Sequence, residues 1–214
     1  MARTRDVFWH HFQDLEHQRE TSALGMWIFL ITEILFFGGM FACYVVYRTA
    51  YPEAWLAGSA TLDVKLGAIN TAVLIGSSLT MAMAVHAAQL GKRMPLVVFL
   101  VLTIVLGGIF LGIKAVEYEH KWEENLIPGP AFDFHGQGAG NVQLFFALYF
   151  ALTGMHALHM VIGIGLLGNL VRQSLAGRFD AAYNTPVEMV GLYWHFVDIV
   201  WIFLFPLLYL LGRH

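Results

Sequence analysis

The feature that most constrains this chain is a series of five long apolar segments. They cover residues 23–47, 66–90, 94–113, 141–171 and 189–212. A helix needs about 20 residues to cross the hydrocarbon core of a bilayer, and each segment meets that length. A membrane barrel is excluded, because its strands hold only about 9–11 residues and alternate in polarity. The sequence therefore predicts an all-α fold, a polytopic membrane helix bundle with five transmembrane helices.

The composition agrees with a membrane location. Of the 214 residues, 58% are apolar and 13% are charged, whereas soluble proteins contain about 45–50% apolar and about 25% charged residues. We expect a polar N-terminal lead-in over residues 1–22, followed by a single membrane domain over residues 23–212. The lead-in is acidic, and the apolar run after it is too long for the core of a signal peptide.

Charge and cysteine content exclude several classes of function. The net charge is −3, and no basic cluster is larger than Lys92-Arg93, so nucleic-acid binding is not expected. The single cysteine, Cys43, excludes an intrachain disulfide and a Cys-x-x-Cys redox or metal motif. The chain also lacks a Gly-x-Ser-x-Gly nucleophile motif and a phosphate-binding loop. We therefore predict no catalytic residue.

Lysine and arginine residues near the ends of the spans predict the orientation, because cytoplasmic loops carry an excess of them. A cytoplasmic N-terminus places seven on the cytoplasmic side and five outside. The cytoplasmic set is Arg3, Arg5, Arg19, Lys92, Arg93, Arg172 and Arg178; the outer set is Arg48, Lys65, Lys114, Lys121 and Arg213. This orientation puts the acidic loop expected at residues 114–140 and the C-terminus outside.

Ionisable residues at membrane depth are the candidate functional residues. Glu33 lies near the middle of the first span, where a charged group is costly, so its carboxyl should be protonated or partnered on another helix. Two interpretations stay open, a proton-linked or inter-subunit role and a neutral carboxyl hydrogen-bonded within the bundle. Two further groups of candidates lie in the last two spans or, for Glu188, one position before the last span: His156 and His159, and Glu188, His195 and Asp198.

The histidines of the last two spans suggest two kinds of site. Two residues that are three positions apart on a helix point in directions that differ by about 60°. His156 and His159 are therefore on the same side of their helix. With His195 and a carboxylate they could ligate zinc or iron. We favour hydrogen bonds between helices and no metal, because no fixed ligand motif is present. In the third span, the spacing of Gly108 and Gly112 predicts close helix packing.

Residues 193–204, Tyr-Trp-His-Phe-Val-Asp-Ile-Val-Trp-Ile-Phe-Leu, resemble the C-terminal signature of subunit III of haem–copper cytochrome c oxidases. Residues 25–37 resemble the segment that carries the carbodiimide-reactive glutamate of that family, here Glu33. Residues 70–74 with His86, residues 153–163, and residues 115–118 match further family segments in the same order. The resemblance covers residues 20–212 and points to the five-helix bacterial form, without the first two helices of the long form.

The resemblance implies a non-catalytic subunit of a terminal oxidase in the bacterial cytoplasmic membrane. The whole complex would reduce oxygen to water and translocate protons, with cytochrome c or a cupredoxin as electron donor. Subunit I would be the main partner, next to subunit II, and those partners would hold the haem and copper. This chain would contain no redox cofactor, would support proton uptake, and would contact phospholipid. Glu117 and Tyr118 are expected to be lipid-contact or packing residues.

Other functions remain open at this point. Within the family, the chain could belong to a quinol oxidase or to a complex associated with nitric oxide reductase. Glu33 favours cytochrome c oxidase, because quinol-oxidase relatives often have another residue there. Outside the family, the histidines could make the chain a haem- or metal-binding membrane anchor. Glu33 and Asp198 could also serve a proton-coupled carrier.

Overall fold

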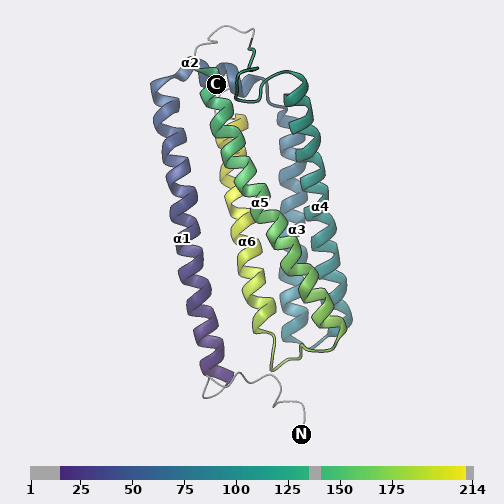
Figure 1. Cartoon of the computed structure of the whole chain (residues 1–214). Helices are drawn as coiled ribbons and strands as arrows, with labels where there is room; N and C mark the ends of the chain where they lie inside the picture. Colours follow the sequence, from purple (N-terminus) through teal and green to yellow (C-terminus); the bar gives the residue numbers. More distant parts are fainter. Residues whose placement is uncertain (1–14, 135–140, 211–214) are drawn as a thin grey trace.

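The computed structural model describes residues 15–134 and 141–210. It confirms the all-helical fold and the five long apolar helices, which run side by side (Figure 1). These helices are α1 (Leu15–Ala50), α3 (Val64–Gln89), α4 (Arg93–Glu123), α5 (Val142–Leu175) and α6 (Thr185–Phe205). A short helix, α2 (Pro52–Ala60), follows α1, and a π-helical turn, η2 (Pro206–Leu210), continues α6.

Several helix boundaries differ by a few residues from the sequence-based expectation, and three differences are larger. Residues 15–22, assigned to the polar lead-in, are the first turns of α1. The short helix α2 was not predicted, although Pro52 is well suited to a first helical turn. The largest correction concerns α4, because residues 114–123, expected in the acidic loop, are helical. No proline or glycine interrupts that segment, and the helix ends only where Asn125 adopts a positive φ of 55°.

Local signals set the turns between the helices. The carboxylate of Asp63 accepts hydrogen bonds from the backbone N–H groups of Lys65 (2.8 Å) and Leu66 (3.2 Å), which caps the start of α3. Gly91 has a φ of +66° in the tight turn between α3 and α4, a conformation that glycine adopts without steric cost. The turn at Gly91 brings α3 and α4 together as neighbours in the bundle.

Helices α3, α4, α5 and α6 form the body of the bundle, and α1 lies along its side (Figure 1). Helix α1 contacts α6, α5 and α2. Many large apolar side chains on the outer surface are exposed, as expected for a protein whose surroundings are lipid or partner helices. They include Leu24, Leu35, Leu79, Met94 and Val105.

A close contact between helices is centred on Trp194, whose side chain is fully buried. A Cβ atom placed on Gly107 of α4 would lie 2.9 Å from the Trp194 ring, and one on Gly163 of α5 would lie 2.8 Å from it. The predicted pair is displaced from this contact. Gly108 and Gly112 face outward, and a Cβ there would meet nothing within 4 Å. The close approach therefore uses Gly107, one position from the expected motif.

Candidate functional site

A buried ion pair lies inside the bundle on α4. Lys114 and Glu117 are each 4% exposed, and Lys114 Nζ lies 3.1 Å from Glu117 Oε2. Their spacing of three residues puts both side chains on one side of the helix. A charge removed from water is costly unless it is paired and fully hydrogen-bonded, so the surroundings of this pair decide its contribution to stability.

Two tyrosines from other elements complete the hydrogen bonds of this pair. Glu117 Oε1 accepts from the hydroxyls of Tyr149 (2.7 Å) and Tyr209 (2.5 Å). Lys114 Nζ lies 3.0 Å from each of the same hydroxyls and 5.4 Å from the centre of the Trp201 ring. We call Lys114, Glu117, Tyr149 and Tyr209 the Lys114 cluster. It joins α4, α5 and η2, and its donors and acceptors satisfy one another.

The Lys114 cluster is not apparent from the sequence, because the apolar residues of the third span end at residue 113. Lys114 was counted as a loop cation, and Glu117 was expected to contact lipid or pack at the surface. The signal that could have found the cluster is the spacing of Lys114, Glu117 and Lys121, which places all three on one helix face. Tyr118, the other predicted packing residue, shares a 2.6 Å hydrogen bond with Thr153 of α5.

Glu33 of α1 meets His159 of α5. The Glu33 Oε2 and His159 Nε2 atoms are 3.1 Å apart, and the Glu33 side chain is 19% exposed. The other ring nitrogen of His159 lies 2.8 Å from the Met155 carbonyl oxygen, and the Tyr193 hydroxyl donates to the His159 carbonyl oxygen at 2.9 Å. The structure thus brings two predicted residues together and links α1 to α5 and α6 through them.

His156 and Glu188 connect other helices. His156 is fully buried, and its Nε2 lies 3.1 Å from the Val197 carbonyl oxygen of α6. Glu188 accepts from Arg19 of α1 at 3.1 Å and from Gln89 of α3 at 2.8 Å, so it ties three helices together near the start of α6. Although His156 is only three residues from His159 in α5, it contacts a different helix, and Glu188 makes a third, separate contact.

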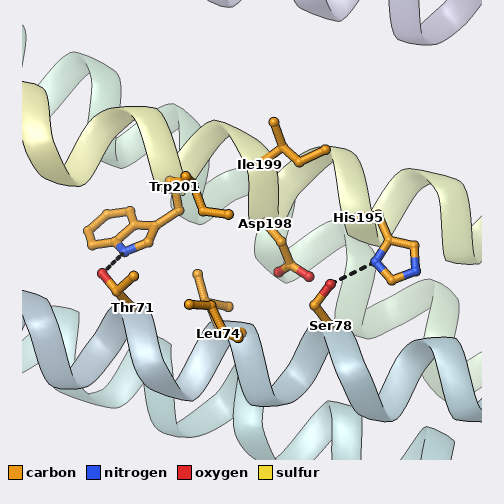
Figure 2. Close-up of a pocket in the computed structure, with 9 residues that line it drawn as sticks. Thr71, Leu74, Ser78, His195, Asp198, Ile199 and Trp201 are labelled. Atoms are coloured by element: carbon orange, nitrogen blue, oxygen red, sulfur yellow. Dashed lines mark hydrogen bonds between the residues drawn. The ribbon is translucent and has the colours of Figure 1, made fainter.

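Asp198 and His195 lie together on the side of α6 that faces α3 (Figure 2). His195 Nδ1 is 2.8 Å from Ser78 Oγ, and Asp198 lies one helical turn further along the pocket. Trp201 donates from Nε1 to Thr71 Oγ1 at 3.0 Å. Unlike Glu117, Asp198 has no hydrogen-bond partner for either carboxylate oxygen among the residues that the structure describes.

The distribution of these side chains bears on the metal hypothesis. Within residues 15–134 and 141–210, no group of three or more histidine, cysteine, aspartate or glutamate side chains is placed to hold a metal ion. The histidines instead contact different neighbours, namely Val197 for His156, Glu33 for His159 and Ser78 for His195. In the described part of the chain the three histidines therefore do not gather into the single zinc or iron site considered above.

Comparison with known proteins identifies the family of the chain. The family model described as cytochrome c oxidase subunit III matches residues 9–213. The chain is 34% identical over 192 residues to cytochrome c oxidase subunit 3 of Thermostichus vulcanus, covering 89% of this chain and 87% of the relative. It is 33% identical over 187 residues to a probable cytochrome c oxidase subunit 3 of Nocardia farcinica, covering 87% and 86% of the two chains. It is 31% identical over 201 residues to quinol oxidase subunit 3 of Bacillus subtilis, covering 92% of each. The chain belongs to the subunit III family of haem–copper oxidases.

Proposed function

We propose that this chain is an accessory subunit III that stabilises the catalytic subunit of a bacterial terminal oxidase and carries no electrons itself. The observation that supports this best is the use of its histidines. His156, His159 and His195 each contact a different neighbouring helix, which is the behaviour of side chains that hold a bundle together. The oxygen reduction and proton translocation of the complex would then take place in partner subunits, which hold the haem and copper.

The proposed partners are subunit I, as the main contact, subunit II, and membrane lipid including phospholipid. The exposed apolar surface of α1 supports this proposal, since 17% of the most apolar part of that helix is buried within the chain, against 50% for α6. A helix with so little contact inside its own chain has a large surface for lipid or a neighbouring subunit. Glu33 lies on this helix and is a candidate for supporting proton uptake at that contact.

The electron donor of the complex can be identified from its subunit II. Relatives named as cytochrome c oxidase and as quinol oxidase subunits are 34% and 31% identical to this chain, so the degree of identity does not separate them. Glu33 favours cytochrome c or a cupredoxin over quinol. A copurifying subunit II with a copper centre would support that donor, and a subunit II without copper would contradict it.

The proposed location is the bacterial cytoplasmic membrane, with the N-terminus in the cytoplasm and the C-terminus outside. The position of Lys114 strengthens the charge argument for this orientation. Because Lys114 and Lys121 both lie within α4 and are each 4% exposed, neither is a loop cation, and the outer set falls from five residues to three against seven inside. Labelling of single cysteines introduced in the turns at Lys92 and at Ala60 would test the orientation from both sides.

Copurification is the direct test of the accessory role. The full chain, tagged in its native membrane, should copurify with a haem-containing subunit I. After the chain is separated from the complex, it should show no Soret band and no stoichiometric metal. Deletion of the chain should leave an oxidase that begins turnover normally and loses activity during turnover. A Soret band on the separated chain, or the absence of oxidase partners, would contradict the proposal.

The proposed special role of Glu33 has its own test. A hydrophobic carbodiimide added to membranes should modify Glu33, whose side chain is 19% exposed beside the lipid-facing surface of α1. Asp198 and Glu117, which are 3% and 4% exposed, provide internal comparisons in the same sample. The Glu33→Gln variant should lose the label. Efficient modification elsewhere with Glu33 untouched would show that the assignment is wrong.

A further inference from the structure

A pocket of about 280 Å³ lies between α3 and α6, near the middle of both helices (Figure 2). Its walls are mostly apolar and include Leu74, Ile75, Ile199 and Ile202. Ile75, Ile199 and Ile202 are each about half exposed, at 56%, 51% and 48%. The mouth of the pocket therefore opens on the membrane-facing surface of the bundle, and a molecule would enter it from the hydrocarbon.

The pocket contains a buried carboxyl that the chain itself does not satisfy. Asp198 is 3% exposed, and neither of its carboxylate oxygens has a hydrogen-bond partner among the described residues. The nearby Ser78 hydroxyl lies 2.8 Å from His195 Nδ1 and close enough to Asp198 to interact with it, but it makes no hydrogen bond of normal geometry to either carboxylate oxygen. A buried polar group without a partner loses its hydration and gains nothing in exchange. The structure thus presents a buried carboxyl with spare acceptor capacity inside a mostly apolar pocket.

These features restrict what the pocket can bind. The ligand must be soluble in lipid, because the mouth faces hydrocarbon, and it must carry a hydrogen-bond donor for Asp198. A permanently charged amine or metal ion would have to cross hydrocarbon without its hydration, which is costly. The volume is close to the lower end for small-molecule sites, about 300 Å³, so it suits a single ring or a short polar end and excludes a whole lipid.

We propose that this pocket binds the hydroxyl-bearing end of a lipid-soluble molecule, with Asp198 accepting the hydrogen bond from that hydroxyl. The apolar body of the molecule would lie between Ile75, Ile199 and Ile202 at the mouth. Two kinds of membrane molecule carry this chemistry, a phenolic ring such as a hydroquinone headgroup and a long-chain aliphatic alcohol. The side of α6 that faces α3 then contains a ligand site next to the His195–Ser78 and Trp201–Thr71 contacts that join the two helices.

Photolabelling can test the pocket in native membranes that contain the full chain. Three diazirine probes of similar length are compared: an alkylphenol, its methyl ether, and a long-chain alcohol. At least one hydroxyl probe should label residues 71–79 or 195–202, about tenfold more than the ether, because the ether cannot donate to Asp198. Preferential labelling by the phenol would identify a phenolic ligand, and preferential labelling by the alcohol an aliphatic one.

Variants of the chain make the result specific to this pocket. Asp198→Leu removes the acceptor, and Ile75→Trp narrows the mouth without changing the carboxyl. Each should reduce labelling by the hydroxyl probe about tenfold, and Ile75→Trp still provides the test if Asp198→Leu fails to accumulate. Glu33→Gln, which changes a carboxyl on α1 outside the pocket, should leave labelling unchanged. Equal labelling by the ether, labelling insensitive to both pocket variants, or no labelling by either hydroxyl probe would overturn the proposal.

Discussion

Two buried carboxyl groups lie on different sides of helix α6, and they differ in how completely they are hydrogen-bonded. Toward α4 and α5, Glu117 is 4% exposed and receives hydrogen bonds from Lys114, Tyr149 and Tyr209. Toward α3, Asp198 is 3% exposed, and its carboxylate oxygens have no partner among the described residues. The first side is closed by aromatic rings, and the second contains a pocket that opens to the membrane.

This difference shows that burial alone does not reveal the role of a carboxyl in a membrane protein. A carboxyl whose hydrogen bonds are complete within its own chain contributes to the packing of that chain, and its removal should be costly. A carboxyl with free acceptors beside an accessible pocket is suited to a molecule from outside, and its removal should cost little. Substitutions on the two sides of α6 can therefore break or sharpen the comparison.

The largest effect is expected at Glu117. Glu117→Leu leaves the Lys114 ammonium buried without its carboxylate, and such a loss typically lowers the free energy of unfolding by about 3–5 kcal/mol. Unfolding of the purified chain in mixed detergent micelles, followed by circular dichroism, measures this change. The double variant Lys114→Met, Glu117→Leu should recover most of the loss, because no uncompensated charge remains.

The matched control for that substitution is Lys65→Met, which changes an exposed lysine at the start of α3 and should shift the free energy of unfolding by less than about 0.5 kcal/mol. If the Glu117→Leu variant were as stable as this control, the Lys114 cluster would contribute no more to the free energy of unfolding than an apolar side chain in the place of Glu117. That result would contradict the inference that the fully hydrogen-bonded carboxyl, Glu117, stabilises the packing of the chain.

A smaller effect is expected where α4 approaches Trp194. A Cβ atom on Gly107 would lie 2.9 Å from the buried ring, so Gly107→Ala should lower the free energy of unfolding by about 1–3 kcal/mol through overpacking. Gly108→Ala adds the same methyl group one residue away, where nothing lies within 4 Å, and should be neutral or slightly stabilising. Equal effects of the two substitutions would contradict the described register of α4.

Two adjacent serines on α3 make hydrogen-bonded contacts with different sides of α6. Ser77 Oγ accepts from Trp194 Nε1 at 2.9 Å in a fully buried position, and Ser78 Oγ meets His195 at the pocket. Ser77→Ala should cost about 0.6 kcal/mol or somewhat more, as is usual for hydrogen bonds between membrane helices. Ser78→Ala should cost less, because the pocket has room for water beside His195. A larger loss for Ser78→Ala in the same unfolding assay would reverse this order.

The five long helices could be predicted from the sequence, because a segment that crosses a bilayer must satisfy its backbone hydrogen bonds as a helix and needs about 20 apolar residues. This requirement produces long apolar segments that are easily recognised in the sequence. The prediction failed at the end of α4, where charged residues look like a loop. Lys114 and Glu117 are tolerated there because each satisfies the other, and the tyrosines that complete the cluster are distant in sequence. Such compensation depends on tertiary contacts, which hydropathy does not encode.

The contacts of the candidate residues also depend on tertiary packing and could not be predicted from the sequence. Sequence spacing could place His156 and His159 on one side of α5, but it could not show that they contact different helices, namely Val197 on α6 and Glu33 on α1. It also placed the close helix contact at Gly108 and Gly112, although the rotation of α4 brings Gly107 to Trp194. The pocket at Asp198 could not be predicted, because it exists only between two packed helices.

The smallest effect on stability is expected at Asp198, and it is the sharpest test of the open side of α6. Asp198→Leu removes a buried polar group that has no partner within the described chain and adds an apolar side chain beside an existing pocket. The free energy of unfolding should therefore change by less than about 1 kcal/mol or increase, since replacing an unsatisfied polar group with an apolar one can stabilise a fold. The micelle assay used for Glu117→Leu measures both variants under the same conditions. A loss as large as that of Glu117→Leu would mean that Asp198 holds its own chain together, and the two sides of α6 would then be alike.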